Sequence, residues 1–101
     1  MGKTEFSGLS TEELMFLISV LDTEDKKEFV QKFRDVFKEL VDNHTISYSW
    51  YRKLLRGYAP SDELMLNAVL LDEKAMKWVI DRAHLKALMV INIVKKTLPG
   101  L

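Results

Sequence analysis

Several kinds of residue are scarce in this 101-residue chain, and each scarcity excludes a class of protein. Cysteine is absent, which excludes disulfides, thiolate metal sites and cysteine nucleophiles. Only four glycines and two prolines occur, and Pro99 and Gly100 stand near the end, so helices meet few interruptions along the chain. No glycine-rich phosphate-binding loop is present.

Long apolar runs are missing as well. No apolar tract exceeds five residues, and the one over residues 87–91, which resumes at 93–94 after Asn92, is well short of the ~20 residues that cross a bilayer. The first six residues lack the apolar run of a secretory signal. We therefore expect a cytoplasmic protein with no membrane partner.

Net charge is also lacking, because 15 basic and 15 acidic residues cancel. Bulk charge therefore cannot bind nucleic acid indiscriminately, and any such binding must come from local charge. The distribution is uneven: residues 1–43 carry ten acids and six bases, residues 44–60 carry three bases and no acid, and residues 61–101 carry six bases and five acids. The middle segment is rich in aromatic residues, which marks it as a candidate binding surface.

The composition, 48% apolar and 30% charged, is typical of one folded domain over residues 1–101. Apolar spacing predicts an all-α fold, a compact bundle of about five helices with a long C-terminal helix. Ser10 and Glu13 have the capping-box form and open a helix over roughly 10–21. The predicted buried stripe of this helix is Leu14, Leu17, Ile18 and Leu21, with Met15 and Phe16 widening it.

Asp22 or Thr23 is expected to cap the next helical segment, over 23–43. Periodicity leaves open whether this segment is one helix of about 20 residues or two helices broken near 32–35. Ser47 is predicted to cap a short helix that reaches Arg56, and Gly57 to end it. The predicted stripe of the 23–43 segment is Phe29, Phe33, Val36, Phe37, Leu40 and Val41.

Two further helices are predicted, one beginning at Pro60 or Ser61 and one over roughly 72–97 that Pro99-Gly100 stops. The last helix is apolar nearly all round from residue 87 to residue 94, so either the other helices or a partner, such as a second copy in a homodimer, covers it. Its predicted inner positions are Met76, Val79, Ile80, Ala83, Ala87, Val90, Ile91 and Val94.

Catalytic and metal-binding patterns are missing from the sequence. His44 and His84 are the only histidines, forty positions apart, with no paired-ligand spacing and no serine beside His84. Acid pairs at 12–13, 62–63 and 72–73 fall at predicted helix starts, where the helix dipole explains them. We therefore expect no enzyme activity, no catalytic residue, no metal and no cofactor.

Four pieces of sequence in residues 37–64 carry a family resemblance. In order they are Glu39-Leu40-Val41, Ile46-Ser47, Leu54-Leu55-Arg56-Gly57 and Pro60-Ser61-Asp62-Glu63-Leu64. This segment resembles the helix-turn-helix of the lambda-repressor-like (XRE) family. The resemblance implies a helix-turn-helix unit over about 37–57 and a sequence-specific DNA-binding regulator of transcription.

The residue types agree with that register. The apolar side chains of Leu40, Ile46, Tyr51 and Leu54 fall where the two helices of the motif pack together. Arginine and lysine can donate to guanine or phosphate, and serine and tyrosine hydroxyls can bind phosphate or base edges. The residues predicted to contact duplex DNA are Ser47, Tyr48, Ser49, Arg52, Lys53 and Arg56.

Other interpretations of this segment stay open. Its apolar residues can be ordinary core and its cations a solvated face, as in a small helical interaction module or inhibitor of phage or mobile-element type that binds a protein and no DNA. Aromatic side chains can also stack on single-stranded bases. The aromatic residues in question are Tyr48, Trp50, Tyr51 and Tyr58.

Overall fold

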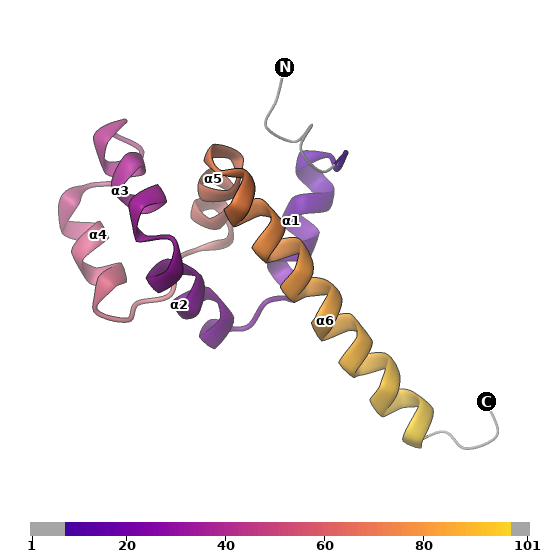
Figure 1. Cartoon of the computed structure of the whole chain (residues 1–101). Helices are drawn as coiled ribbons and strands as arrows, with labels where there is room; N and C mark the ends of the chain where they lie inside the picture. Colours follow the sequence, from indigo (N-terminus) through magenta and orange to yellow (C-terminus); the bar gives the residue numbers. More distant parts are fainter. Residues whose placement is uncertain (1–7, 98–101) are drawn as a thin grey trace.

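The fold is all-α, as the apolar spacing predicted. The computed structural model describes residues 8–97, with side-chain environments up to residue 89, and this part of the chain contains helices and no strand. Figure 1 shows the helices in order. They are α1 (Thr11–Val20), α2 (Thr23–Lys32), α3 (Arg34–Asp42), α4 (Tyr48–Leu55), α5 (Asp62–Leu71) and α6 (Glu73–Thr97). The predicted stop at Pro99-Gly100 lies outside the described residues.

The helix starts follow from local side-chain hydrogen bonds. Ser10 and Glu13 form the predicted capping box, in which the Ser10 hydroxyl accepts from the Glu13 N–H at 3.1 Å and the Glu13 carboxylate accepts from the Ser10 N–H at 2.9 Å. Asp22 and Asp25 make the same reciprocal pair at the start of α2. Ser61, rather than Pro60, caps α5. These caps satisfy backbone donors that have no partner inside the helix.

Residues 23–43 form two helices, so this part of the chain has six helices rather than about five. The break is at Phe33, whose backbone leaves the helical region at φ −118° and ψ 41°. The break changes the direction of the chain while both halves of the apolar stripe still face one core. The ring of Phe29 in α2 thereby packs edge-on against Phe37 in α3, with 5.7 Å between centroids, and against Trp78 in α6 at 5.5 Å.

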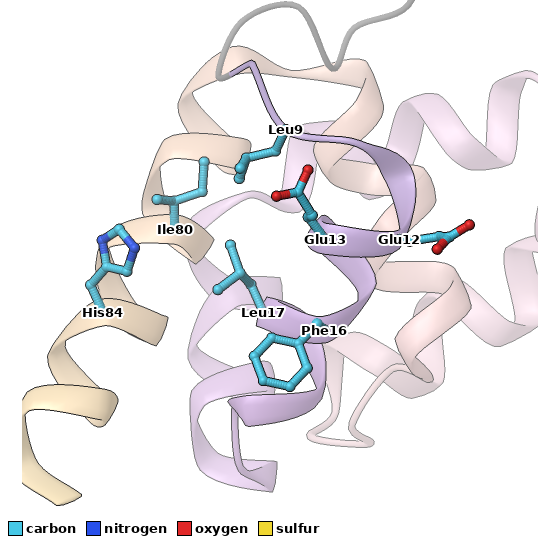
Figure 2. Close-up of a pocket in the computed structure, with 7 residues that line it drawn as sticks. All are labelled: Leu9, Glu12, Glu13, Phe16, Leu17, Ile80 and His84. Carbon is cyan, nitrogen blue, oxygen red and sulfur yellow. The ribbon is translucent and has the colours of Figure 1, made fainter. Parts of the chain in front are cut away.

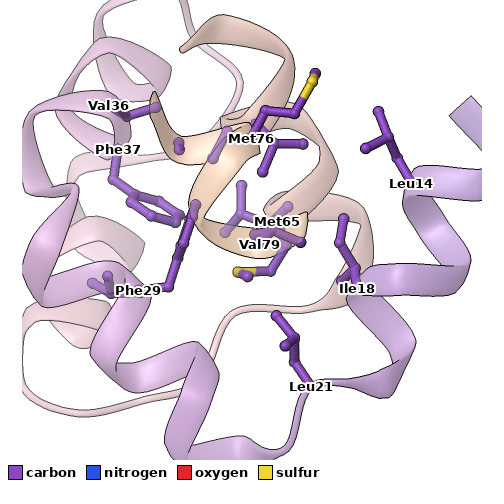
Figure 3. Close-up of a cluster of buried hydrophobic side chains, with 14 of the residues drawn as sticks. Leu14, Ile18, Leu21, Phe29, Val36, Phe37, Met65, Met76 and Val79 are labelled. Carbon is purple, nitrogen blue, oxygen red and sulfur yellow. The ribbon is translucent and has the colours of Figure 1, made fainter. Parts of the chain in front are cut away.

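The core lies where α1, α5 and the first half of α6 meet α2 and α3 (Figure 3). Its largest fully buried side chains include Phe29, Phe37, Leu14, Met65 and Met76. A core of this kind stabilises the fold through the roughly 1.5–3 kcal/mol that each fully buried large apolar side chain contributes. The core stripes of α1, α2 and α3 were mostly predicted correctly from apolar spacing.

Two predicted core positions are wrong. Phe16 widens no buried stripe, because 67% of its surface is exposed. Ala87 was placed on the inner face of α6 but is exposed, whereas Ala83, one turn earlier, is buried. Figure 1 shows that α6 runs out beyond the other helices. The predicted inner positions at 90, 91 and 94 lie outside the described side chains.

A cluster of charged side chains fastens the start of α2 to α6. The buried carboxylate of Asp25 accepts from Arg82 at 2.8 Å and lies 3.1 Å from the Lys86 ammonium. Arg82 also binds Glu28, and Lys86 also binds Asp22 at 2.9 Å. The Asp25 backbone N–H, and after it the Lys86 ammonium, lower the pKa of Asp22 to about 2. Hydrogen bonds to Glu28 and Asp25 raise the pKa of Arg82.

No helix among the described residues is long and apolar enough to cross a membrane.

Candidate nucleic-acid interface

The turn between α3 and α4 is built from side-chain and backbone hydrogen bonds. His44 has a left-handed backbone, with φ 66°, just past the end of α3. Thr45 then donates its N–H to the Leu40 carbonyl at 2.8 Å, and the Asn43 side-chain oxygen accepts from the Thr45 hydroxyl at 2.6 Å. Histidine and asparagine tolerate such turns better than most residues. The chain therefore reverses within residues 43–46 and presents Ser47 as the start of α4.

The inner side of α4 packs on α2 and α3. Leu54 is fully buried, and Ile46, Tyr51 and Leu55 are half-buried against the same core. The Gln31 side chain in α2 donates to the Leu55 carbonyl at 3.2 Å, so it satisfies an acceptor at the open end of α4. The packing positions predicted from the motif register are therefore buried or half-buried.

The outer side of α4 carries the polar residues of the motif. Tyr48, Ser49, Arg52 and Arg56 are exposed, recur at helical spacing opposite Leu54, and together line a shallow hollow of about 240 Å³. Tyr48 is 57% exposed, and its ring lies 6.0 Å from that of Tyr51. The hollow thus presents two guanidinium groups and two hydroxyls to the solvent.

The other two predicted contact residues lie elsewhere. The Ser47 hydroxyl accepts from the Trp50 N–H at 3.1 Å and so serves as the cap of α4. Lys53 is half-buried beside the hollow, with its ammonium 5.3 Å from the centroid of Trp50. Trp50 in turn packs edge-on against Tyr58, at 6.3 Å. Four of the six predicted residues therefore share one surface.

The cations of α4 differ electrostatically from most others in the described residues. Arg82 and Lys86 bind the acids of α2, and Lys26, Lys38 and Lys77 each bind an aspartate. Arg52, Lys53 and Arg56 have no acidic partner within 4.0 Å in this same range, since no acid occurs between Asp42 and Asp62. Unpaired guanidinium groups on an outward face are free to bind an anionic ligand.

Sequence reasoning missed the hydrogen bond of Gln31 to Leu55, which joins residues 24 positions apart and leaves no local pattern. It also left Trp50 and Tyr58 as separate aromatics, although their rings meet across the end of α4. In the part of the chain that the structure describes, no group of three His, Asp or Glu side chains is arranged to hold a metal ion.

No protein-family model, curated protein or solved structure matches the chain.

Proposed function

We propose that this protein is a sequence-specific regulator that binds duplex DNA, with α4 as the recognition helix in the major groove. Arg52 and Arg56 are the principal contacts, Tyr48 and Ser49 support them, and Lys53 reaches a phosphate beside the groove. Ser47 contributes through the start of α4, where backbone N–H groups favour a phosphate oxygen.

The observation that carries this proposal is the unpaired positive charge on one face of α4. A cation that only keeps the surface solvated has no need to stay unpaired, whereas a helix that reads DNA must keep its guanidinium groups free and directed outward. The break at Phe33 supports the same interpretation, because it makes α3 a separate helix that can cross the DNA backbone while α4 enters the groove. The position of α4 at one edge of the molecule leaves it accessible (Figure 1).

The test is a fluorescence-anisotropy titration of a labelled random-sequence duplex at two salt concentrations. Three phosphate contacts per chain predict a salt slope near −2.7, so affinity falls roughly 40-fold between 50 and 200 mM salt. The triple variant Arg52→Ala/Lys53→Ala/Arg56→Ala should lose most of the binding and nearly all of the slope. Absence of binding at low salt, or wild-type binding by the triple variant, contradicts the proposal.

A matched control removes the same charge from another surface. Lys32, Arg34 and Lys74 also lack an acidic partner within 4.0 Å in the described residues, and they line a hollow between the α2–α3 junction and the start of α6. The variant Lys32→Ala/Arg34→Ala/Lys74→Ala therefore lowers net charge by three units without touching α4. It should keep most of the affinity, because the proposal places the contacts on one face rather than in overall charge.

A second candidate function is the binding of a protein through the aromatic edge of α4. Exposed Tyr48 and Tyr58, and Trp50 at 37% exposure, favour it, since tyrosine and tryptophan are enriched in protein interfaces. Salt separates the two functions. An apolar interface hardly responds to moderate salt, while DNA binding weakens steeply.

A further inference from the structure

An apolar groove lies between α1 and α6, on the side of the molecule away from α4. Leu9, Phe16, Leu17, Ile80 and His84 line it together with two glutamates, and its volume is about 530 Å³ (Figure 2). In Figure 2, Leu17 points between the two helices and the Glu13 carboxylate lies on the rim near Leu9 and Ile80. Hydrogen bonds to Ser10 lower the pKa of Glu13, so this rim is negatively charged at neutral pH.

From the groove onward, the sequence of α6 has the residue spacing of a coiled-coil seam. From Ile80 the positions advance by four, three, four and three residues, and all but one of them are apolar. They are Ile80, His84, Ala87, Ile91 and Val94. Alternating steps of four and three residues place side chains along one stripe, and helices pair through that stripe. The helical backbone continues to Thr97, so the sequence places every position of the seam on α6.

The described chain covers only the first part of this helix. Ala87 is exposed, Leu88 is 59% exposed, and Leu85 and Met89 are each 53% exposed. Figure 1 shows α6 running out beyond the other helices. At about 100° per residue, Leu88 lies beside the seam, while Leu85 and Met89 lie roughly 140–180° around the helix from it. Ala87 and Leu88 are therefore the exposed apolar positions on the side of the seam, where the described helices leave α6 uncovered.

We propose that a second copy of the chain covers this face, with its α6 antiparallel to the first around a two-fold axis near Ala87. In that arrangement position i lies level with position 174 − i, so the partner's Val94 lies level with Ile80 in the groove. The small side chain of Ala87 at the axis permits close approach of the two helices. Each copy thereby supplies both a groove and the helix end that fills it.

Charge and size favour a second copy as the occupant. The sequence places Lys95 and Lys96 at the end of α6, level with the partner's residues 78–79 and near the charged rim formed by Glu13. The contact from Ile80 to Thr97 is about 27 Å long at 1.5 Å per residue, and a helix width of about 10 Å gives a footprint of roughly 270 Å² per copy. The paired helices thus supply about a third of the roughly 800 Å² per partner of a stable interface, and the helix end that fills the groove against α1 adds to this area.

The pairing of α6 stands by itself, while its use rests on the proposed function. A two-fold assembly carries two copies of α4, as a protein needs that reads two half-sites about 34 Å apart. The dimer is tested in the absence of DNA, so the two proposals can fail separately. If the chain is a dimer but the triple variant of α4 binds DNA as the wild type does, only the proposed function is overturned.

The first experiment is sedimentation velocity on the full chain. The expected species is a dimer of twice 11.8 kDa, and Ala87→Glu should sediment at 11.8 kDa because it places two like charges at the axis. Since Ala87 is exposed in the single chain, the variant should keep the helix content of the wild type, which circular dichroism measures. A monomeric wild type, or a dimeric Ala87→Glu, overturns the proposal.

The second experiment tests the register. The chain has no cysteine, so Ala87→Cys gives one thiol, and two copies form a disulfide when their Cα atoms come within about 4.4–6.8 Å. Mild oxidation should give a covalent dimer of Ala87→Cys and none of Glu63→Cys, whose exposed position lies on α5. A dimer that Ala87→Cys fails to cross-link overturns the antiparallel pairing, and equal cross-linking of both variants overturns the interface.

Discussion

Arg82 binds two carboxylates, one buried and one exposed, so the effects of burial and of hydrogen-bond geometry on stability can be compared at one cation. Arg82 donates to Asp25 at 2.8 Å and to Glu28 at 2.9 and 3.2 Å. Glu28 has the better geometry, since both of its oxygens bind the guanidinium, and it is the larger influence on the pKa of Arg82. Asp25 has the drier environment: its side chain is 6% exposed, against 55% for Glu28.

We predict that burial outweighs geometry. Asp25→Ala removes two charge-assisted hydrogen bonds and the acceptor of the Asp22 N–H, but Arg82 keeps Glu28 and Lys86 keeps Asp22, so neither cation is left unpaired. Hydrogen bonds to charged groups contribute about 1.5–3 kcal/mol each, and the loss of desolvated carboxylate contacts should cost about 2–3 kcal/mol in all. Glu28→Ala should cost about 0.5 kcal/mol, because water screens an exposed pair.

Urea unfolding at pH 7 measures both free energies, and urea is preferred to guanidinium because it leaves charges unscreened. Double-mutant cycles with Arg82→Met then isolate the coupling of each carboxylate to Arg82. We expect about 1.5 kcal/mol for Asp25 and under about 0.5 kcal/mol for Glu28. Equal coupling, or a larger value for Glu28, would refute the reasoning, because bidentate geometry would then matter more than burial.

Three further predictions concern turns and caps. His44→Gly should stabilise the fold by about 0.5–1 kcal/mol, since it relieves a left-handed backbone that costs residues other than glycine about 1–2 kcal/mol. Gly57→Ala should destabilise the fold by about 1–2 kcal/mol, because Gly57 has φ 111°; the cost comes from the backbone alone, since no atom lies within 4 Å of an added Cβ. Thermal unfolding measures both changes. The lowered pKa of Asp22 predicts stability that is complete above its usual value of 3.8 and is lost as the pH falls through about 2. Asp22→Asn keeps a capping side chain but should show a weaker loss of stability between pH 5 and pH 2, and an unchanged pH profile would contradict the assignment.

Local features of the fold were predictable from the sequence. The caps at Ser10, Ser47 and Ser61 depend only on residues three positions away, so a short pattern contains the whole interaction. Two helices broken near 32–35 were one of two alternatives that the sequence left open, and the structure shows that one, with the break at Phe33. Periodicity could not decide between one helix and two, because no glycine or proline marks the break and both halves of the stripe keep the same spacing. The exposure of Ala87 depends on where other helices end, which the periodicity of α6 does not contain.

The candidate site was predictable to a similar degree. Helical spacing alone places Tyr48, Ser49, Arg52 and Arg56 on one face of α4. In the structure these four residues line one hollow, in agreement with that spacing. The position of Lys53 against Trp50 was not foreseen, because Lys53 lies at the edge of that face, where a neighbouring ring attracts its ammonium.

Helix α2 connects the two ends of the molecule. Its first turn is fixed to α6 through Asp25, and its last turn is fixed to α4 through the hydrogen bond of Gln31 to Leu55, about 9 Å further along at 1.5 Å per residue. A helix of this length transmits displacement as a rigid rod, because its backbone hydrogen bonds resist bending over three turns. A shift of α6 would therefore move the end of α4, so the ten residues of α2 set the relative orientation of the two surfaces.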